Sequence, residues 1–389
     1  MSIMKIKDLT EQIRGVSYKP SDVVTSDVGL PILRANNIKG NSLSFDDLVF
    51  VKPERVSKKQ ILQNGDIVIC ASSGSKELVG KAGVFSNNDM YSFGAFCKAV
   101  RVKRIDGINS NYVRLYFGSK YYRECIAMSS KGSNINNIKT ENIEELSINI
   151  PSAEEQNIAV SLLNALISAI KHKKQELFSL DELVKSRFIE MFGEPLVNEY
   201  NFPKKKLSDT FLLSAGGTPK TDKKEYWDNG TISWIGSNMC QNQILYQNDG
   251  KYITELGLKN SSAKIFDVDT VLIALVGATI GKTALLKFPT ATNQNVLGIQ
   301  KIANAAYNPY FVYYYMQGLY DRFIDLGDGK FKMASKGFVG DLEIFVVDLH
   351  LQNEFAEFVK LIDKSKFIVQ QQIKDLQELV DSKMDEYFR

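Results

Sequence analysis

The chain has 389 residues, of which 44% are hydrophobic and 24% are charged, and this globular usage excludes a disordered or fibrous protein. Its formal net charge of +3 permits nucleic-acid binding without arguing for it, because local basic patches matter more than the total. Four scattered cysteines without a CxxC pair, and only two histidines, argue against a disulfide frame or a zinc site. No apolar stretch approaches the ~20 residues that span a bilayer, and the N-terminus lacks the apolar core of a signal peptide, so we expect a soluble, cytoplasmic protein.

The second half of the sequence repeats the first half with small shifts in register. Loop insertions and deletions in a duplicated unit produce such shifts. The residues that align as identities include Gly15 with Gly216, Lys19 with Lys220, Asn37 with Asn238, Asp66 with Asp269, Gly74 with Gly277, Leu180 with Leu376 and Glu190 with Glu386. The sequence therefore predicts two homologous units.

Each repeat begins with a mixed region. Residues 1–151 contain short apolar runs that predict strands, such as 66–71, and a helical stretch at 114–128. Residues 207–347 repeat this mixture, with a strand predicted at 270–275. We therefore expect two homologous heads in an α+β fold.

Each repeat ends with a long helix, predicted over residues 152–192 and 348–389. Between the first helix and the second head, residues 193–206 form a linker, because Gly193 and Pro195 break the helical pattern. The order of the chain is thus head, helix, linker, head, helix.

Both helices carry apolar residues at alternating steps of three and four, which predicts a coiled-coil seam rather than a one-sided stripe. The seam residues are Leu163, Leu166, Ile170, Leu177, Leu180, Val184, Val359, Ile362, Val369, Ile373, Leu376 and Val380. The alternative is two unrelated amphipathic helices, each packing on its own head. Because of the order of the segments, the second helix can pack on the first only by running back. We therefore expect an antiparallel pair, with the heads related by a pseudo-two-fold axis.

Two short motifs suggest catalysis or nucleotide binding but depart from the patterns that these functions need. The stretch 308–311 resembles the Asn-Pro-Pro-aromatic tetrad of adenine methyltransferases but lacks the second proline, and a helix start with Pro309 in first position explains it better. The stretch 277–283 suggests a phosphate-binding loop, yet has three residues between its glycines where that loop has four. A turn between strands is our preferred interpretation.

Basic and small polar residues gather in the Ser- and Asn-rich loops of both heads. Lys and Arg pair with phosphates, whereas Asn, Gln, Ser and Arg also read base edges. The candidate DNA-binding residues are Lys19, Arg34, Asn36, Asn37, Ser72, Ser73, Lys76, Lys131, Asn134, Lys139, Lys220, Thr221, Lys223, Lys224, Ser237, Asn238, Lys282, Lys330, Lys332 and Lys336. Any one of them alone is more often an ordinary surface residue; as loops repeated in both heads they form a candidate surface.

The start of each long helix carries a repeated Gln-Asn pair, at 156–157 and 352–353. These residues are candidate contacts for a partner protein. The alternative is local helix-start chemistry, since Ser152 and Glu155 have the spacing of a capping box.

Taken together, these patterns resemble the specificity subunits of type I restriction–modification systems over essentially the whole chain. No single motif is decisive, but their order and duplication are specific. The motifs are RGVSYKPSDV with GLPILRANNI, SAGGTPKTDKKEYW with GTISWIGSNM, NGDIVICASSG, DVDTVLIALVGATIGK, IPSAEEQNIAVSLL and FIEMFGEP. One departure is visible: Val347 stands where the first copy has Pro151, which leaves the start of the second helix open.

The resemblance implies two target-recognition domains, each reading half of an asymmetric, interrupted DNA target. It also implies that the helices set the gap and help to dock two methyltransferase subunits, and through them restriction and translocation subunits. The chain itself would be non-catalytic and bind no cofactor or metal, with S-adenosylmethionine, ATP and magnesium on the partners. The competing functions are a stand-alone methyltransferase or nuclease and a two-headed transcriptional regulator. They would need a glycine-rich cofactor loop, an acidic metal cluster or a helix-turn-helix pattern.

Overall fold

The computed structural model describes residues 2–75, 77–129, 137–302, 306–326 and 333–389. The chain forms two compact units, the first from residues 1–175 and 370–389 and the second from residues 176–369. The two long helices are α5 (Ala153–Phe192) and α11 (Leu349–Phe388), and each contributes one half to each unit.

In the first unit, short strands and helices alternate as the apolar runs predict. The strands are β1 (Ser2–Lys5), β2 (Thr10–Arg14), β3 (Val23–Val24), β4 (Leu30–Leu33), β5 (Ile38–Lys39), β6 (Ser42–Leu43), β7 (Val49–Val51), β8 (Ile67–Cys70), β9 (Ala82–Val84), β10 (Ser92–Phe93), β11 (Cys97–Val102) and β12 (Ser147–Ile150). The helices are α1 (Ile6–Leu9), α2 (Ser110–Tyr116), α3 (Lys120–Ser129) and α4 (Thr140–Glu144), with 3-10 turns η1 (Pro20–Asp22), η2 (Ala35–Asn37), η3 (Pro53–Arg55) and η4 (Lys58–Gln60).

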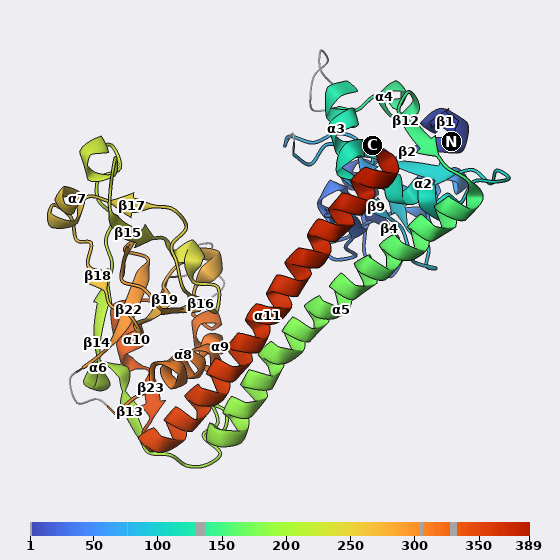
Figure 1. The fold of residues 1–389 in the computed structure, drawn as a ribbon. Helices are drawn as coiled ribbons and strands as arrows, with labels where there is room; N and C mark the ends of the chain where they lie inside the picture. The colour runs from blue at the N-terminus through green and yellow to red at the C-terminus, as the bar shows by residue number, and fades with distance from the viewer. Residues whose placement is uncertain (1, 76, 130–136, 303–305, 327–332) are drawn as a thin grey trace. The chain divides into compact units, whose positions relative to one another are not determined.

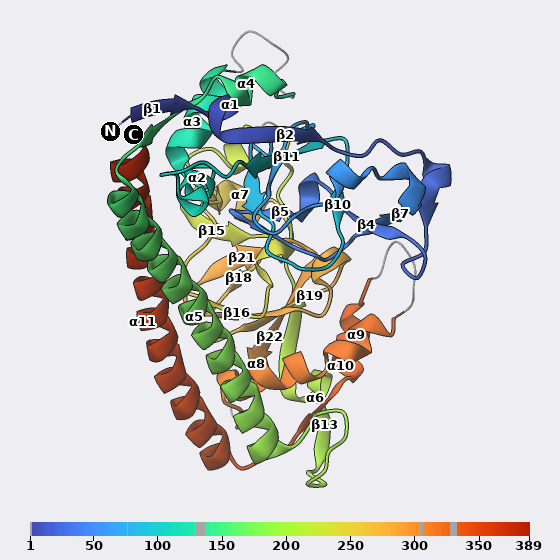
Figure 2. The same ribbon diagram turned by 90° about the vertical axis from the view of Figure 1, so that its right-hand side faces the viewer.

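These strands form a four-stranded sheet in the order β2-β11-β8-β9, a second one in the order β10-β4-β7-β3, and the pairs β1-β12 and β5-β6. Figure 2 shows β10, β4 and β7 as neighbours. Strand β8 is buried on both faces because its side chains alternate between two cores. Ile67 and Ile69 join the core under α2 and α3, whereas Val68 and Cys70 join the core on the other face.

The second unit repeats this arrangement. Its strands are β13 (Lys204–Lys206), β14 (Phe211–Ala215), β15 (Ile232–Ile235), β16 (Gln243–Leu245), β17 (Tyr252–Ile253), β18 (Ile265–Phe266), β19 (Val271–Ala274), β20 (Thr283–Leu286), β21 (Thr290–Thr292), β22 (Val296–Lys301) and β23 (Glu343–Phe345). Its helices are α6 (Leu207–Thr210), α7 (Glu255–Lys259), α8 (Pro309–Gly318), α9 (Tyr320–Ile324) and α10 (Lys336–Asp341), with 3-10 turns η5 (Lys224–Tyr226), η6 (Ser237–Met239) and η7 (Gly277–Thr279).

The sheet order β14-β22-β19-β20 repeats β2-β11-β8-β9, and β16 extends it by one strand. The parallel pairing of β15 with β21 repeats that of β4 with β10, and β13-β23 repeats β1-β12. The predicted α+β fold with two homologous heads is thus confirmed. The alternation of β19 matches that of β8, with Val271 and Ile273 in one core and Leu272 and Ala274 in the other.

The long helices α5 and α11 pack together in each unit (Figure 1). In the first unit, Leu163 near the start of α5 shares a core with Val380 near the end of α11. In the second unit, Val184 near the end of α5 shares a core with Val359 near the start of α11. The pair is therefore antiparallel, as the segment order predicts.

All predicted seam residues are shielded from solvent. The buried ones are Leu163, Ile170, Val184, Val359, Val369 and Val380, and the half-buried ones are Leu166, Leu177, Leu180, Ile362, Ile373 and Leu376. Ion pairs flank the seam in the second unit, where Arg187 reaches Glu354 at 3.3 Å and Lys366 reaches Asp181 at 2.5 Å. The mutual pair is confirmed over the alternative of unrelated helices.

Candidate nucleic-acid interface

In the first unit, the loops that follow β2, β8 and β10 are joined by backbone hydrogen bonds. The Val16 N–H donates to the carbonyl of Phe93 at 2.8 Å, and the Ser72 N–H donates to the carbonyl of Phe96 at 3.0 Å. Ser72 also forms a bridge with Asn137. We call this group the first loop cluster; it comprises residues 15–19, 34–37, 71–75, 94–96 and 137–139.

The second unit has the same arrangement. The Gly217 N–H donates to the carbonyl of Thr292 at 2.8 Å, the Leu275 N–H to that of Asn295 at 2.8 Å, and the Ala334 N–H to that of Leu275 at 2.8 Å. The second loop cluster comprises residues 216–224, 236–239, 275–279, 293–295 and 333–336. In both clusters main-chain bonds join the loops, so many of the side chains that project from them are free to differ.

The aligned glycines Gly15 and Gly216 make this close approach feasible. A Cβ on Gly15 would lie 2.1 Å from the carbonyl oxygen of Gly94, and a Cβ on Gly216 would lie 2.4 Å from that of Thr292. Any side chain here would push the loops apart. The repeated glycines therefore reflect loop packing.

The lysine-rich segment of the second cluster is held by two indoles. The Trp227 Nε1–H donates to the carbonyl of Lys220 at 3.1 Å, and the Trp234 Nε1–H donates to that of Gly217 at 3.0 Å. The two rings pack edge to face with centroids 5.1 Å apart. The exposed side chains of this segment are those of Lys220, Thr221, Asp222, Lys223 and Lys224, with three lysines to one aspartate. An ordered backbone thus carries cationic side chains into solvent, which suits contact with phosphates.

The loop after β4 holds a polar constellation around Asp47. The Arg34 Nη2 group donates to the Asp47 carboxylate at 2.9 Å, and the exposed Asn36 amide donates to the same carboxylate oxygen at 2.9 Å. Lys19, on the neighbouring loop, is exposed. Arg34 and Asn36 are therefore held in place by an acidic residue.

Asn37 does not belong to the exposed surface. Its side chain is buried, accepting a hydrogen bond from the Arg34 N–H at 2.8 Å and donating to the carbonyl of Asp46 at 2.6 Å. The structure also corrects its alignment. Asn36 is the second residue of η2, and the exposed Asn238 is the second residue of η6, so Asn36 rather than Asn37 corresponds to Asn238.

The remaining candidates vary in exposure. Ser72, Ser73, Ser237 and Lys282 are half-buried, and the Lys282 ammonium donates to the Gln241 amide oxygen at 3.0 Å. Lys139 and Lys336 are exposed at the starts of α4 and α10. The candidates outside the described residues are Lys76, Lys131, Asn134, Lys330 and Lys332.

Sequence reasoning missed a turn that connects the loops of each cluster. In the second unit it is Asn293-Gln294-Asn295, and the Thr218 hydroxyl donates to the Gln294 amide oxygen. In the first unit the equivalent turn is Gly94-Ala95-Phe96, which carries no amide or charge. Aligning the strands on either side of these turns, β10 with β21 and β11 with β22, would have found them.

The two motifs that suggested catalysis or nucleotide binding are structural. Asn308 caps α8 by accepting a hydrogen bond from the Tyr310 N–H at 3.0 Å, and Tyr310 and Phe311 are buried, so the tetrad cannot hold a flipped base. The glycine-rich stretch at 277–283 forms η7 between β19 and β20, without the helix that follows a phosphate-binding loop. Both confirm the structural interpretations.

Reactive groups are scarce among the residues that the structure describes. Burial raises the pKa of Cys97 and of Cys240 to about 12, so these thiols stay protonated at neutral pH and are poor nucleophiles. Within the described ranges, no three His, Cys, Asp or Glu side chains are grouped so as to hold a metal ion. Nor does any helix there have the length and apolar character needed to cross a membrane.

The repeated Gln-Asn pairs make contacts inside the chain. The buried Gln156 amide donates to the carbonyls of Gly107 at 2.9 Å and Pro151 at 3.0 Å, and accepts from the Asn109 N–H at 2.8 Å. The Asn109 amide in turn donates to Asn157. Ser152 and Glu155 also form the predicted capping box. For the buried Gln156, the helix-start interpretation is therefore favoured over the partner contact.

Comparison with known proteins decides the family. The profile of the type I restriction modification DNA specificity domain matches residues 1–179 and again residues 200–378. The chain belongs to this family. The chain is 38% identical over 182 residues to the specificity subunit of the type I restriction enzyme StySPI from Salmonella potsdam. This match covers 46% of this chain and 39% of that protein.

Further matches of this specificity-domain protein are consistent with this family. The EcoKI specificity subunit of Escherichia coli strain K12 is 36% identical over 185 residues, which cover 47% of this chain and 39% of the relative. These curated matches thus span well under half of either relative. The crystal structure of the S subunit from M. genitalium aligns over 100% of this chain and 96% of its own, with a TM-score of 0.52 and 14% identity. A structure from work on complex assembly of the type I R-M system covers 100% and 97%, with a TM-score of 0.58 and 13% identity. At these identities the likeness shows the fold.

Proposed function

We propose that this specificity-domain protein is the DNA-reading subunit of a type I restriction–modification complex and recognises a split, asymmetric target. Residues 1–151 read one half-site and residues 207–347 read the other, and the length of the helix pair sets the gap between them. The observation that carries the proposal is the pair of loop clusters, which share one main-chain framework and differ in the side chains that project from it.

Each cluster supplies the two kinds of contact that sequence-specific binding needs. In the second cluster, the exposed lysines of 220–224 lie on the same loop as Thr218, which orients Gln294. Lysines at phosphates fix the register on the duplex, and amide side chains read base edges, above all adenine. In the first cluster, Lys19 takes the phosphate role and Arg34 with Asn36 the base-reading role.

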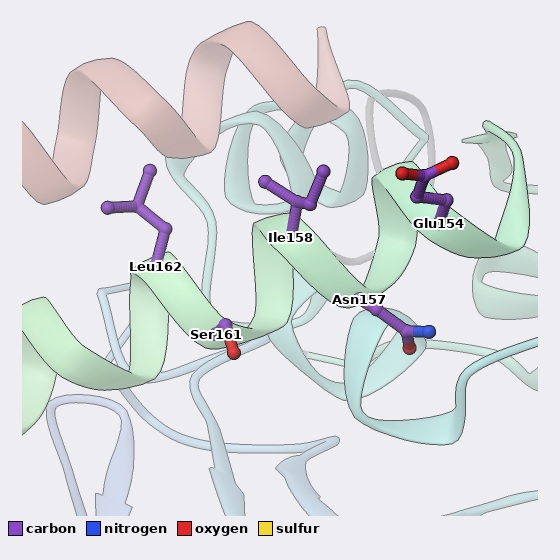
Figure 3. Close-up of a pocket in the computed structure, with 5 residues that line it drawn as sticks. All are labelled: Glu154, Asn157, Ile158, Ser161 and Leu162. Atoms are coloured by element: carbon purple, nitrogen blue, oxygen red, sulfur yellow. The ribbon is translucent and has the colours of Figure 1, made fainter.

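The helix pair provides a surface for partner subunits. On α5, a shallow hollow is lined by Glu154, Asn157, Ile158, Ser161 and Leu162, and Figure 3 shows Glu154, Ile158 and Leu162 projecting from successive turns of one side of the helix. Ile158 is 55% exposed there, and on α11 Phe367 is 69% exposed. Contiguous exposed apolar residues mark protein contact sites, and Ile158 and Leu162 lie on adjacent turns of one side of α5. We propose that two methyltransferase subunits dock on the helices, with restriction and translocation subunits bound through them.

In this proposal the chemistry resides on the partners, which bind S-adenosylmethionine, ATP and magnesium. The competing function is a stand-alone methyltransferase. Its one sequence motif, the tetrad at Asn308, is an N-cap followed by buried aromatic rings. The specificity role therefore accounts for the structure better.

The test is methylome sequencing of a methylation-free host that expresses the chain with its methyltransferase subunit. We expect one split motif, and replacing residues 207–347 with the matching segment of a relative should change one half of it. Methylation by the purified chain alone would contradict the proposal. So would a domain exchange that alters both halves of the motif.

A further inference from the structure

The turn Gly94-Ala95-Phe96 places a phenylalanine in the middle of the first loop cluster. The turn is closed by the Cys97 N–H, which donates to the carbonyl of Gly94 at 2.8 Å. The carbonyl of Phe96 accepts hydrogen bonds from the N–H groups of Ala71 at 2.9 Å and Ser72 at 3.0 Å. The backbone of Phe96 is thus fixed by the loop that follows β8.

The equivalent turn of the second cluster is closed by the same kind of backbone hydrogen bond. Unlike the first turn, it carries amide side chains. It is closed by the Val296 N–H, which donates to the carbonyl of Asn293 at 3.2 Å, and the carbonyl of Asn295 accepts from the Leu275 N–H at 2.8 Å. Asn295 therefore occupies the position of Phe96. The two heads present amide groups in one case and an aromatic ring in the other at the same place in the framework.

The ring of Phe96 is exposed to solvent. It is 68% exposed, whereas the neighbouring Phe93 and Cys97 are buried. Phe96 is a central residue of this turn, and the hydrogen bonds on either side of it fix its backbone and so the direction of its side chain. Turning it inward would break the two hydrogen bonds to its carbonyl, and each unsatisfied buried group costs about 1–3 kcal/mol. The exposure is therefore built into the turn.

The loops bonded to this turn carry small polar residues. Ser72 bonds directly to the backbone of Phe96 and bridges to Asn137. On the edges of bases in the major groove, the one apolar group is the C5 methyl of thymine. We propose that Phe96 reads a thymine in the first half-site by contact with this methyl group. The inference rests on the proposed function and names a specificity-determining residue of its first head.

The test removes the methyl group and the ring separately. After the split target is known from the methylome, duplexes are made in which each thymine of the first half-site is replaced by deoxyuridine, which lacks only the methyl. Their affinities are measured for the full complex with its methyltransferase subunits. The chain is wild type, Phe96→Ala, Phe96→Leu or, as the control, Ile3→Ala, which removes an exposed apolar side chain from β1 in the same unit.

For the wild-type chain, we expect one deoxyuridine to weaken binding about fourfold, the effect of one buried carbon group. Phe96→Ala should abolish this effect, Phe96→Leu should retain part of it, and Ile3→Ala should retain all of it. If no deoxyuridine weakens specific binding, or if the effect survives in Phe96→Ala, the inference is wrong while the proposed function stands. If the wild-type complex binds without sequence preference, the proposed function itself fails.

Discussion

Gln156 and Gln352 make equivalent hydrogen bonds at the starts of the two long helices. The Gln352 amide donates to the carbonyls of Ala306 at 3.2 Å and Val347 at 2.9 Å, and accepts from the Asn308 N–H at 2.9 Å. Each glutamine therefore ties its helix to the strand before it and to a loop of the head. Both side chains are fully buried.

Replacing Gln156 by Ala should destabilise the protein by roughly 1–3 kcal/mol or more, because buried main-chain groups lose their partners. Urea unfolding followed by circular dichroism measures this loss. Gln175→Ala, at an exposed position of the same helix, is the matched control and should stay within about 0.5 kcal/mol of wild type. Equal stability of the two variants would show that the network is dispensable.

Replacing Lys223 and Lys224 by Ala should weaken binding to all DNA sequences alike, since lysines on an exposed loop pair with phosphates. The slope of log affinity against log salt should fall by about 0.9 for each phosphate pairing that the substitution removes. Fluorescence anisotropy on specific and random duplexes checks both effects, with Lys374→Ala on α11 as the control. A weakening confined to one base position would mean that these lysines read bases.

Replacing Asp47 by Asn should strengthen DNA binding, because in the wild-type protein the Asp47 carboxylate neutralises Arg34. The expected gain is about fivefold at low salt, the effect of ~1 kcal/mol for one charge near a phosphate in water. Asn suits the positive φ of 50° at this position, so the loop should persist. Asp89→Asn makes the same charge change at another exposed site of this unit. An equal gain there would point to overall charge instead.

Replacing Asp363 by Asn should raise the melting temperature at pH 7. The Asp363 Oδ2 atom is buried with no hydrogen-bond partner among the described residues. Burial raises the pKa of this carboxyl, and Asp181 raises it further against the opposing effect of Lys366. The folded state then binds the proton more tightly than the unfolded state, so wild-type stability falls as pH rises through the folded pKa.

The Asp363→Asn substitution removes this titration, so its advantage should grow from near zero below about pH 4, where both states are protonated, to a maximum at neutral pH. Calorimetry across this range checks the trend. Asp222→Asn, at an exposed loop position, should change little at any pH. A variant that is less stable than wild type at pH 7 would show that the carboxylate is stabilising.

Lengthening both helices by one heptad should widen the gap between the half-sites, if helix length sets it as proposed. Inserting about seven residues after Leu177 and after Val369 keeps the seam in register and adds about 10 Å. That corresponds to about three base pairs at ~3.4 Å each. Methylome sequencing should show unchanged half-sites around a longer gap. The same insertion after Val197, in the linker, should leave the gap as it is.

The sequence was sufficient for the features that depend on repetition and periodicity. The duplication follows from the aligned identities of the two halves. The helix seam follows from residues such as Leu163 and Val380, whose spacing reflects burial along a helix. The sequence left the start of the second helix open because Val347 replaces the proline of the first copy, and the structure shows that α11 begins at Leu349. The carbonyl of Val347 accepts from Gln352 as that of Pro151 does from Gln156, so a proline is not required there.

The candidate surface was harder to predict, because exposure at a turn depends on bonds between distant loops. Asn36 and Asn37 are adjacent and identical, and the sequence could not tell which one pairs with Asn238. Their positions in the turns η2 and η6 decide it, and the Asn37 side chain is buried in bonds to Arg34 and Asp46. Phe96 looks like a core residue by type, and its exposure follows from the hydrogen bonds to its carbonyl. No local pattern contains that information.

The main-chain bonds within each loop cluster affect which substitutions the protein tolerates during evolution. Because the carbonyls of Phe96 and Asn295 join the loops whatever side chain is attached, substitutions at these positions should leave folding largely untouched. Mutational drift can therefore act on recognition alone, one head at a time. If the two heads read DNA as proposed, a gene duplication followed by such drift is sufficient to turn two identical readers in one chain into readers of different sequences.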